Sequence, residues 1–118
     1  MSTVSIGLFR NAENPLVLSA GEVVFNQGDP CNDMYVVVEG EVDIVLGEKV
    51  LETVSPGGIF GEMALVDDSP RSATARARTA CKLAPVNQHR FLYLIQNTPF
   101  FALQVMSIMA ERIRRKNG

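Results

Sequence analysis

Arg71 is the residue whose place in the sequence most clearly demands a chemical partner. The segment after it alternates between polar and small apolar residues, as a half-buried strand does, in the order Ser72, Ala73, Thr74, Ala75, Arg76, Ala77, Arg78. By the same period of two, Arg71 falls on the alanine face. Because burying a guanidinium is costly unless an anion meets it, the sequence predicts a carboxylate or phosphate partner. The candidates are Glu62, nine residues earlier, and a ligand bound from outside.

A short helix-forming run from Glu62 to Val66 precedes this strand. Gly61 comes directly before it. The first backbone amides of a helix have no intrahelical acceptor and can point at an anion. Residues 67–70, Asp-Asp-Ser-Pro, then break the helix. The start of this run is therefore a predicted phosphate-binding position.

The stretch from Phe60 to Ala75 resembles the phosphate-binding cassette of the cyclic-nucleotide-binding domain family. This family includes bacterial catabolite activator proteins, protein kinase A regulatory subunits and cyclic-nucleotide-gated channels. The matching strings are Phe-Gly-Glu-Met-Ala-Leu and Pro-Arg-Ser-Ala-Thr, with nine residues from Glu62 to Arg71. The resemblance extends through most of the chain, because further glycines fall where the family turns between strands: Gly21, Gly28, Gly40, Gly57 and Gly58.

The resemblance implies specific roles in binding a cyclic nucleotide. Glu62 would accept a hydrogen bond from the ribose 2′-hydroxyl, and Arg71 would pair with the equatorial oxygen of the cyclic phosphate. A mutual ion pair between these two residues is the structural alternative. Gly61, Met63 and Ala64 would contribute backbone groups. The full set of implied ligand-binding residues is Phe60, Gly61, Glu62, Met63, Ala64, Arg71, Ser72 and Ala73.

Ser72 bears on which nucleotide binds. Threonine at this position resembles sites that prefer cyclic GMP, whereas serine resembles the bacterial cyclic-AMP sensors. The resemblance therefore favours cyclic AMP, although a serine hydroxyl can bond to either base or to phosphate. Ser72 is equally acceptable as an ordinary solvent-facing strand residue.

The walls and lid of the base pocket are less clearly marked. By alternation, Ile44, Val54 and Ala73 are plausible walls, and all three are equally plausible core residues. In the family the last helix supplies a cover over the base. The predicted last helix has no aromatic residue after Phe101, so the candidates are Met109, Arg112 and Ile113, or a residue of a partner subunit.

Length and composition are those of an ordinary globular domain. The 118 residues fit a single domain, 1–118, with 47% hydrophobic and 20% charged residues. A net charge of -2 predicts no direct binding to nucleic acid and no attraction to a membrane surface. There is no signal-peptide pattern and no apolar run long enough for a membrane span, so we expect a cytoplasmic location.

The sequence lacks the residues that a metal site or a hydrolytic active site would need. Cys31 and Cys81 are far apart, neither lies in a paired motif, and His89 is the single histidine. Zinc binding or a histidine-based triad would need more such groups. We therefore expect no catalytic site, no metal site and no enzymatic activity. A metal-dependent enzyme of the cupin kind is disfavoured because it would need inward-facing histidines, and His89 lies on a predicted helix.

The predicted fold is α+β and mainly β: an antiparallel jelly-roll barrel with a helical cassette and two C-terminal helices. Residues 1–15 form a loosely attached N-terminal arm, and residues 16–86 form the barrel, with the cassette at 60–75 between the fifth and sixth strands. Strands are expected at 16–18, 22–26, 34–39, 42–46, 50–54, 72–78 and 80–86.

Two helices are expected over 87–116, with Asn87 capping the first and Thr98-Pro99 starting the second. An apolar stripe on the second helix is wide enough to cover the barrel and contact a second chain, and consists of Phe101, Ala102, Val105, Met106, Ile108, Met109 and Ile113. We expect the basic cluster at the end of this helix to be solvated, because the helix dipole favours cations there: Arg112, Arg114, Arg115 and Lys116.

These observations predict a cyclic-nucleotide sensor that binds cyclic AMP, or cyclic GMP, and signals through movement of the last helix. The expected partners are the nucleotide, a second copy of the chain through that helix, and an unidentified effector protein. The alternative is a domain that has lost its ligand and acts only by dimerisation on the same fold.

Overall fold

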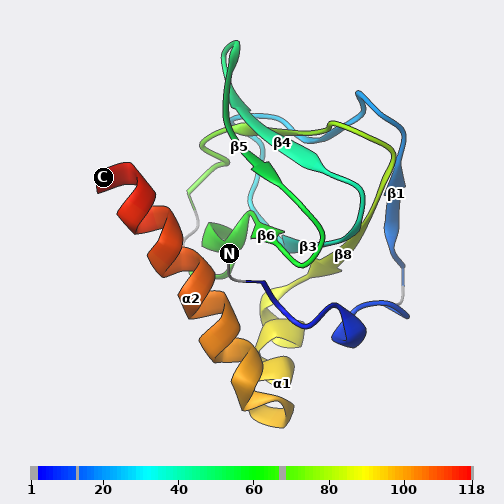
Figure 1. Cartoon of the computed structure of the whole chain (residues 1–118), viewed down its shortest axis with the longest axis vertical. Coiled ribbons are helices and arrows are strands. Elements are labelled where there is room, and N and C mark those ends of the chain that lie inside the picture. Colours follow the sequence, from blue (N-terminus) through cyan, green and yellow to red (C-terminus); the bar gives the residue numbers. More distant parts are fainter. Residues whose placement is uncertain (1–2, 13, 67–68, 118) are drawn as a thin grey trace.

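The computed structural model describes residues 3–12, 14–66 and 69–117 (Figure 1). Within these residues, eight strands form two four-stranded antiparallel sheets, ordered β1-β8-β3-β6 and β2-β7-β4-β5. Their bounds are β1 Leu16–Leu18, β2 Val23–Phe25, β3 Met34–Glu39, β4 Val42–Leu46, β5 Lys49–Val54, β6 Ile59–Phe60, β7 Thr74–Ala77 and β8 Cys81–Val86. The sheets face each other in a jelly-roll-like arrangement. The predicted jelly roll is confirmed, but it is an open pair of sheets rather than a closed barrel.

Strands β1, β3 and β4 have the bounds that the sequence predicts. Strands β5 and β8 differ by one residue at their first end, and β2 and β7 are shorter than predicted by one or two residues at each end. The sequence pattern missed β6, which pairs with β3 through Tyr35–Phe60 and Val36–Ile59. Both of its residues are buried. A strand of two residues is too short to show a period of two, so alternation cannot reveal it.

The predicted alternation along β7 is confirmed. Ala73, Ala75 and Ala77 are buried, whereas Arg76 and Arg78 are exposed. Arg71 lies on the alanine side and is 6% exposed.

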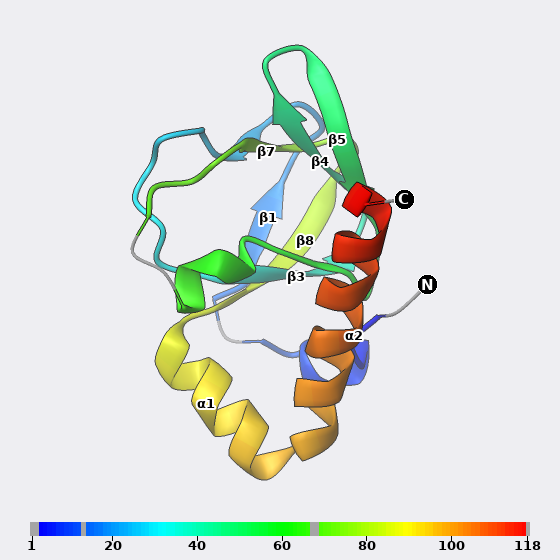
Figure 2. The same cartoon turned by 90° about the vertical axis from the view of Figure 1, so that its left-hand side faces the viewer.

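Two helices follow the sheets and form a V beneath them (Figure 2). Helix α1 spans Gln88–Asn97 and helix α2 spans Pro99–Asn117. The Oδ1 atom of Asn87 accepts a hydrogen bond from the Arg90 amide at 2.8 Å, which confirms the predicted cap. Among the described residues, no single helix is long and apolar enough to cross a membrane. Helices α1 and α2 have the necessary length and composition only when they are taken together, and the pair is bent by 118°.

The buried face of α2 is narrower than the predicted stripe. Phe101, Val105 and Ile108 are buried, but Met106 and Ile113 are 56% and 60% exposed. The helix is turned so that its inner face continues to Arg112, which lies one turn beyond Ile108. That residue belongs to the basic cluster that we expected to be solvated, and its side chain is only 16% exposed.

The N-terminal segment is part of the core, so the loose attachment expected for residues 1–15 is wrong for the residues described. Val4 and Phe9 are 3% and 2% exposed and belong to the apolar cluster that strands β3, β6 and β8 form with the two helices. The Val4 amide donates to the Gly57 carbonyl oxygen at 2.7 Å. A single 3-10 turn, Ile6–Leu8, joins the two contacts. Such a short turn leaves no periodic pattern in the sequence.

Candidate functional site

The predicted cassette, 60–75, begins with the last residue of β6, and after Gly61 it continues as a 3-10 helix, Glu62–Leu65. This helix is one residue shorter than expected. Gly61 has a φ of 73°, in the left-handed region that favours glycine. A Cβ atom there would lie 2.5 Å from Nη1 of Arg71. The conformation therefore favours glycine at this position, and a Cβ atom would force Nη1 of Arg71 to move.

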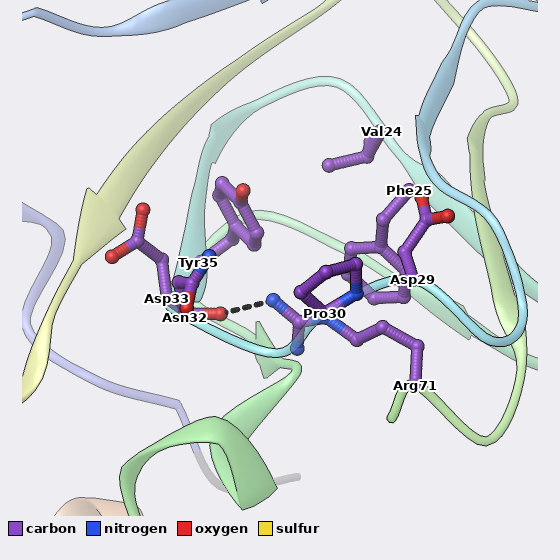
Figure 3. A pocket seen from close by; sticks show the side chains of 8 residues that line it. All are labelled: Val24, Phe25, Asp29, Pro30, Asn32, Asp33, Tyr35 and Arg71. Carbon is purple, nitrogen blue, oxygen red and sulfur yellow. Dashed lines mark hydrogen bonds between the residues drawn. The ribbon is translucent and has the colours of Figure 1, made fainter. Parts of the chain in front are cut away.

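The Arg71 guanidinium lies against the backbone of two segments. Nη1 donates to the carbonyl oxygen of Gly61 at 3.1 Å, and Nη2 donates to the carbonyl oxygen of Asp33 at 2.5 Å (Figure 3). Its Cζ atom is 4.0 Å from the centroid of the Phe25 ring. The buried Nε atom has no hydrogen-bond partner among the residues that the structure describes. This buried charge is thus held by dipoles and an aromatic face, with one donor unsatisfied.

Arg71 lines a cavity of about 250 Å³ beside the loop between β2 and β3 (Figure 3). The lining residues are Val24, Phe25, Asp29, Pro30, Asn32, Asp33, Tyr35 and Arg71. Burial raises the pKa of the Tyr35 hydroxyl above its ordinary value; the charge of Asp33 adds to this effect, and that of Arg71 opposes it. Tyr35 also stacks on Phe60, with ring centroids 5.3 Å apart.

Glu62 does not pair with Arg71, so the mutual ion pair considered as an alternative is not formed. Its Oε1 atom instead accepts a hydrogen bond from Nη1 of Arg112 in α2 at 2.8 Å. Both side chains are 16% exposed. The cassette carboxylate is therefore joined to the last helix.

Arg112 also contacts Glu52 of β5. Nε and Nη2 of Arg112 both donate to this carboxylate, with the shortest distances at 3.0 Å, and Nη2 donates to the carbonyl oxygen of Ile59 as well. Burial alone would lower the pKa of Arg112, but the hydrogen bonds and negative charges of Glu52 and Glu62 outweigh it and raise the pKa. Arg112 is thus fully engaged and is not a free cover for a base.

The other implied site residues differ in their exposure. Phe60 and Ala73 are buried, at 2% and 8% exposure. Met63 and Ala64 lie in the 3-10 helix, and the Met63 side chain is 53% exposed. Ser72 is exposed. The helix-breaking residues Asp67 and Asp68 lie outside the part of the chain that the structure describes.

The three predicted base walls do not line the cavity at Arg71. Val54 belongs to the apolar core between the sheets, and Ile44 packs against that core. Ala73 is buried at the start of the β7 face. The lid candidates Met109 and Ile113 are half-buried and exposed, respectively, on α2.

Sequence reasoning missed Asp33 and Glu52 as parts of this arrangement. Asp33 contributes its backbone carbonyl, for which the side-chain sequence carries no signal. Glu52 did carry one, because by alternation it shares a face with the buried Val54. A carboxylate on that face required a partner in the same way as Arg71.

Comparison with known proteins identifies the family. Residues 15–98 match the model of the cyclic nucleotide-binding domain, which is well over half of the chain. The chain therefore belongs to the cyclic nucleotide-binding domain family. This is a family of regulatory domains.

Three relatives are informative. Over 88 residues, the chain is 38% identical to the cAMP-dependent protein kinase regulatory subunit of Schizosaccharomyces pombe, covering 74% of this chain and 21% of that protein. The catabolite activator protein of Thermus thermophilus superposes with a TM-score of 0.77 at 28% identity, covering 96% of this chain and 60% of that one. The cAMP-bound form of EAL enzyme Bd1971 gives a TM-score of 0.64 at 31% identity, covering 88% and 29%.

EAL enzyme Bd1971 has also been solved in a cGMP-bound form, which matches with a TM-score of 0.63 at 29% identity, covering 89% of this chain and 29% of that one. Either cyclic nucleotide is thus bound by a structural relative. The chain spans only 21% of the kinase regulatory subunit and 60% of the Thermus protein. The similarity therefore concerns the domain and not the activities of those whole proteins.

Proposed function

We propose that this domain is a cyclic-nucleotide sensor whose ligand is cyclic AMP. In this proposal Arg71 binds the cyclic phosphate and Glu62 accepts a hydrogen bond from the ribose 2′-hydroxyl. Ser72 follows Arg71 in sequence and is exposed, and we propose that its hydroxyl bonds to the phosphate or the base. In the same proposal Gly61, Met63 and Ala64 supply backbone groups, and Phe60 and Ala73 complete the ligand-binding set.

The observation that carries the proposal is the state of Arg71. Arg71 is a charged residue and is only 6% exposed. It forms no ion pair with an acidic residue in the described ranges 3–12, 14–66 and 69–117, and its Nε atom is unpartnered. Backbone carbonyls compensate a buried positive charge only in part. A phosphodiester would supply both the missing charge and an acceptor for the remaining donors.

Glu62 fits the second half of the ligand. Arg112 bonds to its Oε1 atom, and we assign Oε2 to the ribose hydroxyl. A carboxylate has lone pairs on both oxygens, so the two hydrogen bonds are compatible. Because Arg112 belongs to α2, a change at the ribose reaches the helix that the proposal makes the output. The ligand acts only by its difference in affinity between two helix arrangements.

The choice of cyclic AMP over cyclic GMP is supported by Ser72 and by the similarity to the cAMP-dependent protein kinase regulatory subunit of Schizosaccharomyces pombe. EAL enzyme Bd1971 has been solved with cyclic AMP and with cyclic GMP, so similarity to it does not favour one nucleotide over the other. Titration with both nucleotides decides between them.

The decisive experiment is calorimetric titration with cyclic AMP and cyclic GMP, repeated on Arg71→Ala. We expect micromolar or tighter binding that the substitution weakens by at least about tenfold, which corresponds to ~1.4 kcal/mol. Arg76→Ala is the matched control, because Arg76 is an exposed arginine of the same segment. Unchanged affinity in Arg71→Ala would refute the assigned role of this residue.

A second candidate function is dimerisation without a ligand. Helix α2 exposes several large apolar side chains: Phe100, Leu103, Met106 and Ile113, at 68%, 57%, 56% and 60% exposure. An apolar face of this kind favours contact with a second copy of the chain. If neither nucleotide produces heat while sedimentation shows a folded dimer, this second function replaces the first.

A further inference from the structure

The Arg71 guanidinium lies over the ring of Phe25, the last residue of β2. The Cζ atom of Arg71 is 4.0 Å from the centroid of this ring and 6.0 Å from that of the Tyr35 ring. A cation is attracted to the negative face of an aromatic ring, most strongly where water is excluded. Because Arg71 is only 6% exposed, its contact with Phe25 is of this desolvated kind.

We infer that Phe25 is a positioning residue, whose ring holds the Arg71 guanidinium where it can bind the cyclic phosphate. The inference rests on the proposed function and deepens it, because it assigns part of the affinity for the phosphate to a residue outside the cassette. Phe25 acts on the ligand only through Arg71.

The backbone of Arg71 is fixed by the loop between β2 and β3. Its amide donates to the carbonyl oxygen of Asp29 at 2.9 Å, and its carbonyl oxygen accepts from the amide of Gly28 at 2.8 Å. These bonds place the backbone, but a long arginine side chain still has many rotamers. Phe25 restricts that freedom from the neighbouring strand, where it pairs with Ala75 of β7.

The contact with Phe25 does not compete with the ligand for hydrogen-bond donors. Nη1 and Nη2 of Arg71 donate to the carbonyl oxygens of Gly61 and Asp33, so a phosphate that takes these N–H groups must replace those bonds. The ring of Phe25 needs no hydrogen bond. Nε, which has no partner within the described part of the chain, also stays available. Phe25 can therefore hold the guanidinium both before and after a phosphate binds.

Two other aromatic rings support the ring of Phe25. Its centroid lies 6.2 Å from that of Tyr35 and 6.0 Å from that of Phe60, and the Tyr35 and Phe60 rings stack with centroids 5.3 Å apart. Rings packed at such distances attract one another and have little freedom to move. They come from β2, β3 and β6 and so from both sheets. Such a preordered contact reduces the cost of ordering Arg71 when a ligand binds.

The test is the affinity of Phe25→Leu for cyclic AMP, measured by calorimetry. Leucine is apolar but has no ring face, so the guanidinium of the free variant can turn toward water. Only a fraction of the molecules then holds Arg71 in place, and the apparent affinity falls by that fraction. We expect a loss of about five- to tenfold. Phe25→Tyr retains the ring and should bind like the wild type, and Phe25→Met replaces Phe25→Leu if the latter does not fold.

Phe91→Leu is the matched control. Phe91 is a half-buried phenylalanine whose ring contacts that of Phe101, in the apolar cluster that includes the helices. This variant should lose stability but keep its affinity for cyclic AMP. In an Arg71→Ala chain, Phe25→Leu should cause no further loss of affinity, because its effect passes through the guanidinium. An equal loss with and without Arg71 would overturn the inference.

A second measurement needs no nucleotide. The pKa of Tyr35 is raised by burial and by the charges of Asp33 and Cys31, and the charge of Arg71 lowers it. If Phe25→Leu releases the guanidinium, the midpoint of the Tyr35 titration should rise in ultraviolet difference spectra against the same chain with Tyr35→Phe. Mere loosening of the packing would expose Tyr35 and move the midpoint down.

The two measurements separate the possible failures. Wild-type affinity and an unchanged midpoint in a folded Phe25→Leu chain overturn the inference and leave the proposed function standing. A raised midpoint in a chain that binds neither nucleotide refutes the proposed function, while it supports the hold of Phe25 on Arg71.

Discussion

The Nη1 atom of Arg71 donates a hydrogen bond to the carbonyl oxygen of Gly61 at 3.1 Å. The residue that precedes the cassette helix therefore holds the arginine that the sequence places nine residues after Glu62. The guanidinium lies so close to Gly61 that a side chain at this position would overlap with it. The two residues depend on each other for their positions.

Replacing Gly61 by Ala should reduce both stability and nucleotide affinity. The left-handed backbone costs an L-residue about 1–2 kcal/mol, and the new Cβ atom, 2.5 Å from Nη1, displaces the guanidinium. We expect a loss of about tenfold in affinity for cyclic AMP. Chemical denaturation and calorimetry measure the two effects separately.

Gly47→Ala is the control for the backbone effect. Gly47 has a φ of 63°, but a Cβ atom there would meet nothing within 4 Å. It should therefore show the loss of stability without the loss of affinity. Equal affinities in the two alanine variants would contradict the proposed part of Gly61 in placing Arg71.

A second prediction concerns the N-terminal segment. Phe9 is 2% exposed, and its ring centroid lies 5.6 Å from that of Phe101. Phe9→Ala should lower the free energy of unfolding by about 3–5 kcal/mol, the usual cost of removing a buried phenylalanine. Thermal and urea denaturation measure this change.

The matched control is Phe100→Ala, which removes the same side chain from a site that is 68% exposed. Its effect on the unfolding free energy should stay within about 0.5 kcal/mol. If Phe9→Ala were as mild as this control, the N-terminal segment would be the loose arm that its sequence suggests.

The sequence predicted the sheets well because their residues alternate. The order of polar and apolar side chains around Ala75 placed Arg71 on the buried face, and the structure confirms that burial. The same logic fails for Ile59–Phe60 and for the turn at Ile6–Leu8, because segments of two or three residues show no period. Local pattern is informative only where an element is long enough to repeat.

The partner of Glu62 was beyond prediction for a different reason. Arg112 lies fifty residues away in the chain, so only the packing of α2 on the sheets brings the two together. On sequence alone, a cation near a helix end is explained by the helix dipole. The network of Arg112, Glu52 and Glu62 is a tertiary feature without a local signature.

A third prediction uses the ionisation of Tyr35. Burial raises the pKa of its hydroxyl above the ordinary value of 10.0. The folded chain thus retains this proton more tightly than the unfolded chain does. The resulting contribution to stability is complete at pH values below the pKa of Tyr35 in the unfolded chain. It is lost as the pH rises through the pKa of Tyr35 in the folded chain.

The difference between ultraviolet titration curves of the wild type and Tyr35→Phe isolates this group, because Tyr93 is present in both. Its midpoint should lie above pH 10.0. Arg71→Ala should move the midpoint further up, since the charge of Arg71 lowers the pKa of Tyr35. A midpoint that falls in Arg71→Ala would contradict the cation's position beside this ring.

The last prediction concerns the choice of base and follows from Ser72, which is exposed directly after Arg71. Ser72→Thr keeps the hydroxyl but adds a branch at Cβ, which restricts χ1 and holds the hydroxyl in fewer directions. If this hydroxyl reaches the guanine amino group, the affinity ratio should shift toward cyclic GMP by about two- to tenfold, the effect of one hydrogen bond.

Ser72→Ala, which lacks the hydroxyl, should not shift the ratio toward cyclic GMP. The same shift in both variants would mean that the side chain at this position selects by size, and that the hydroxyl takes no part in reading the base.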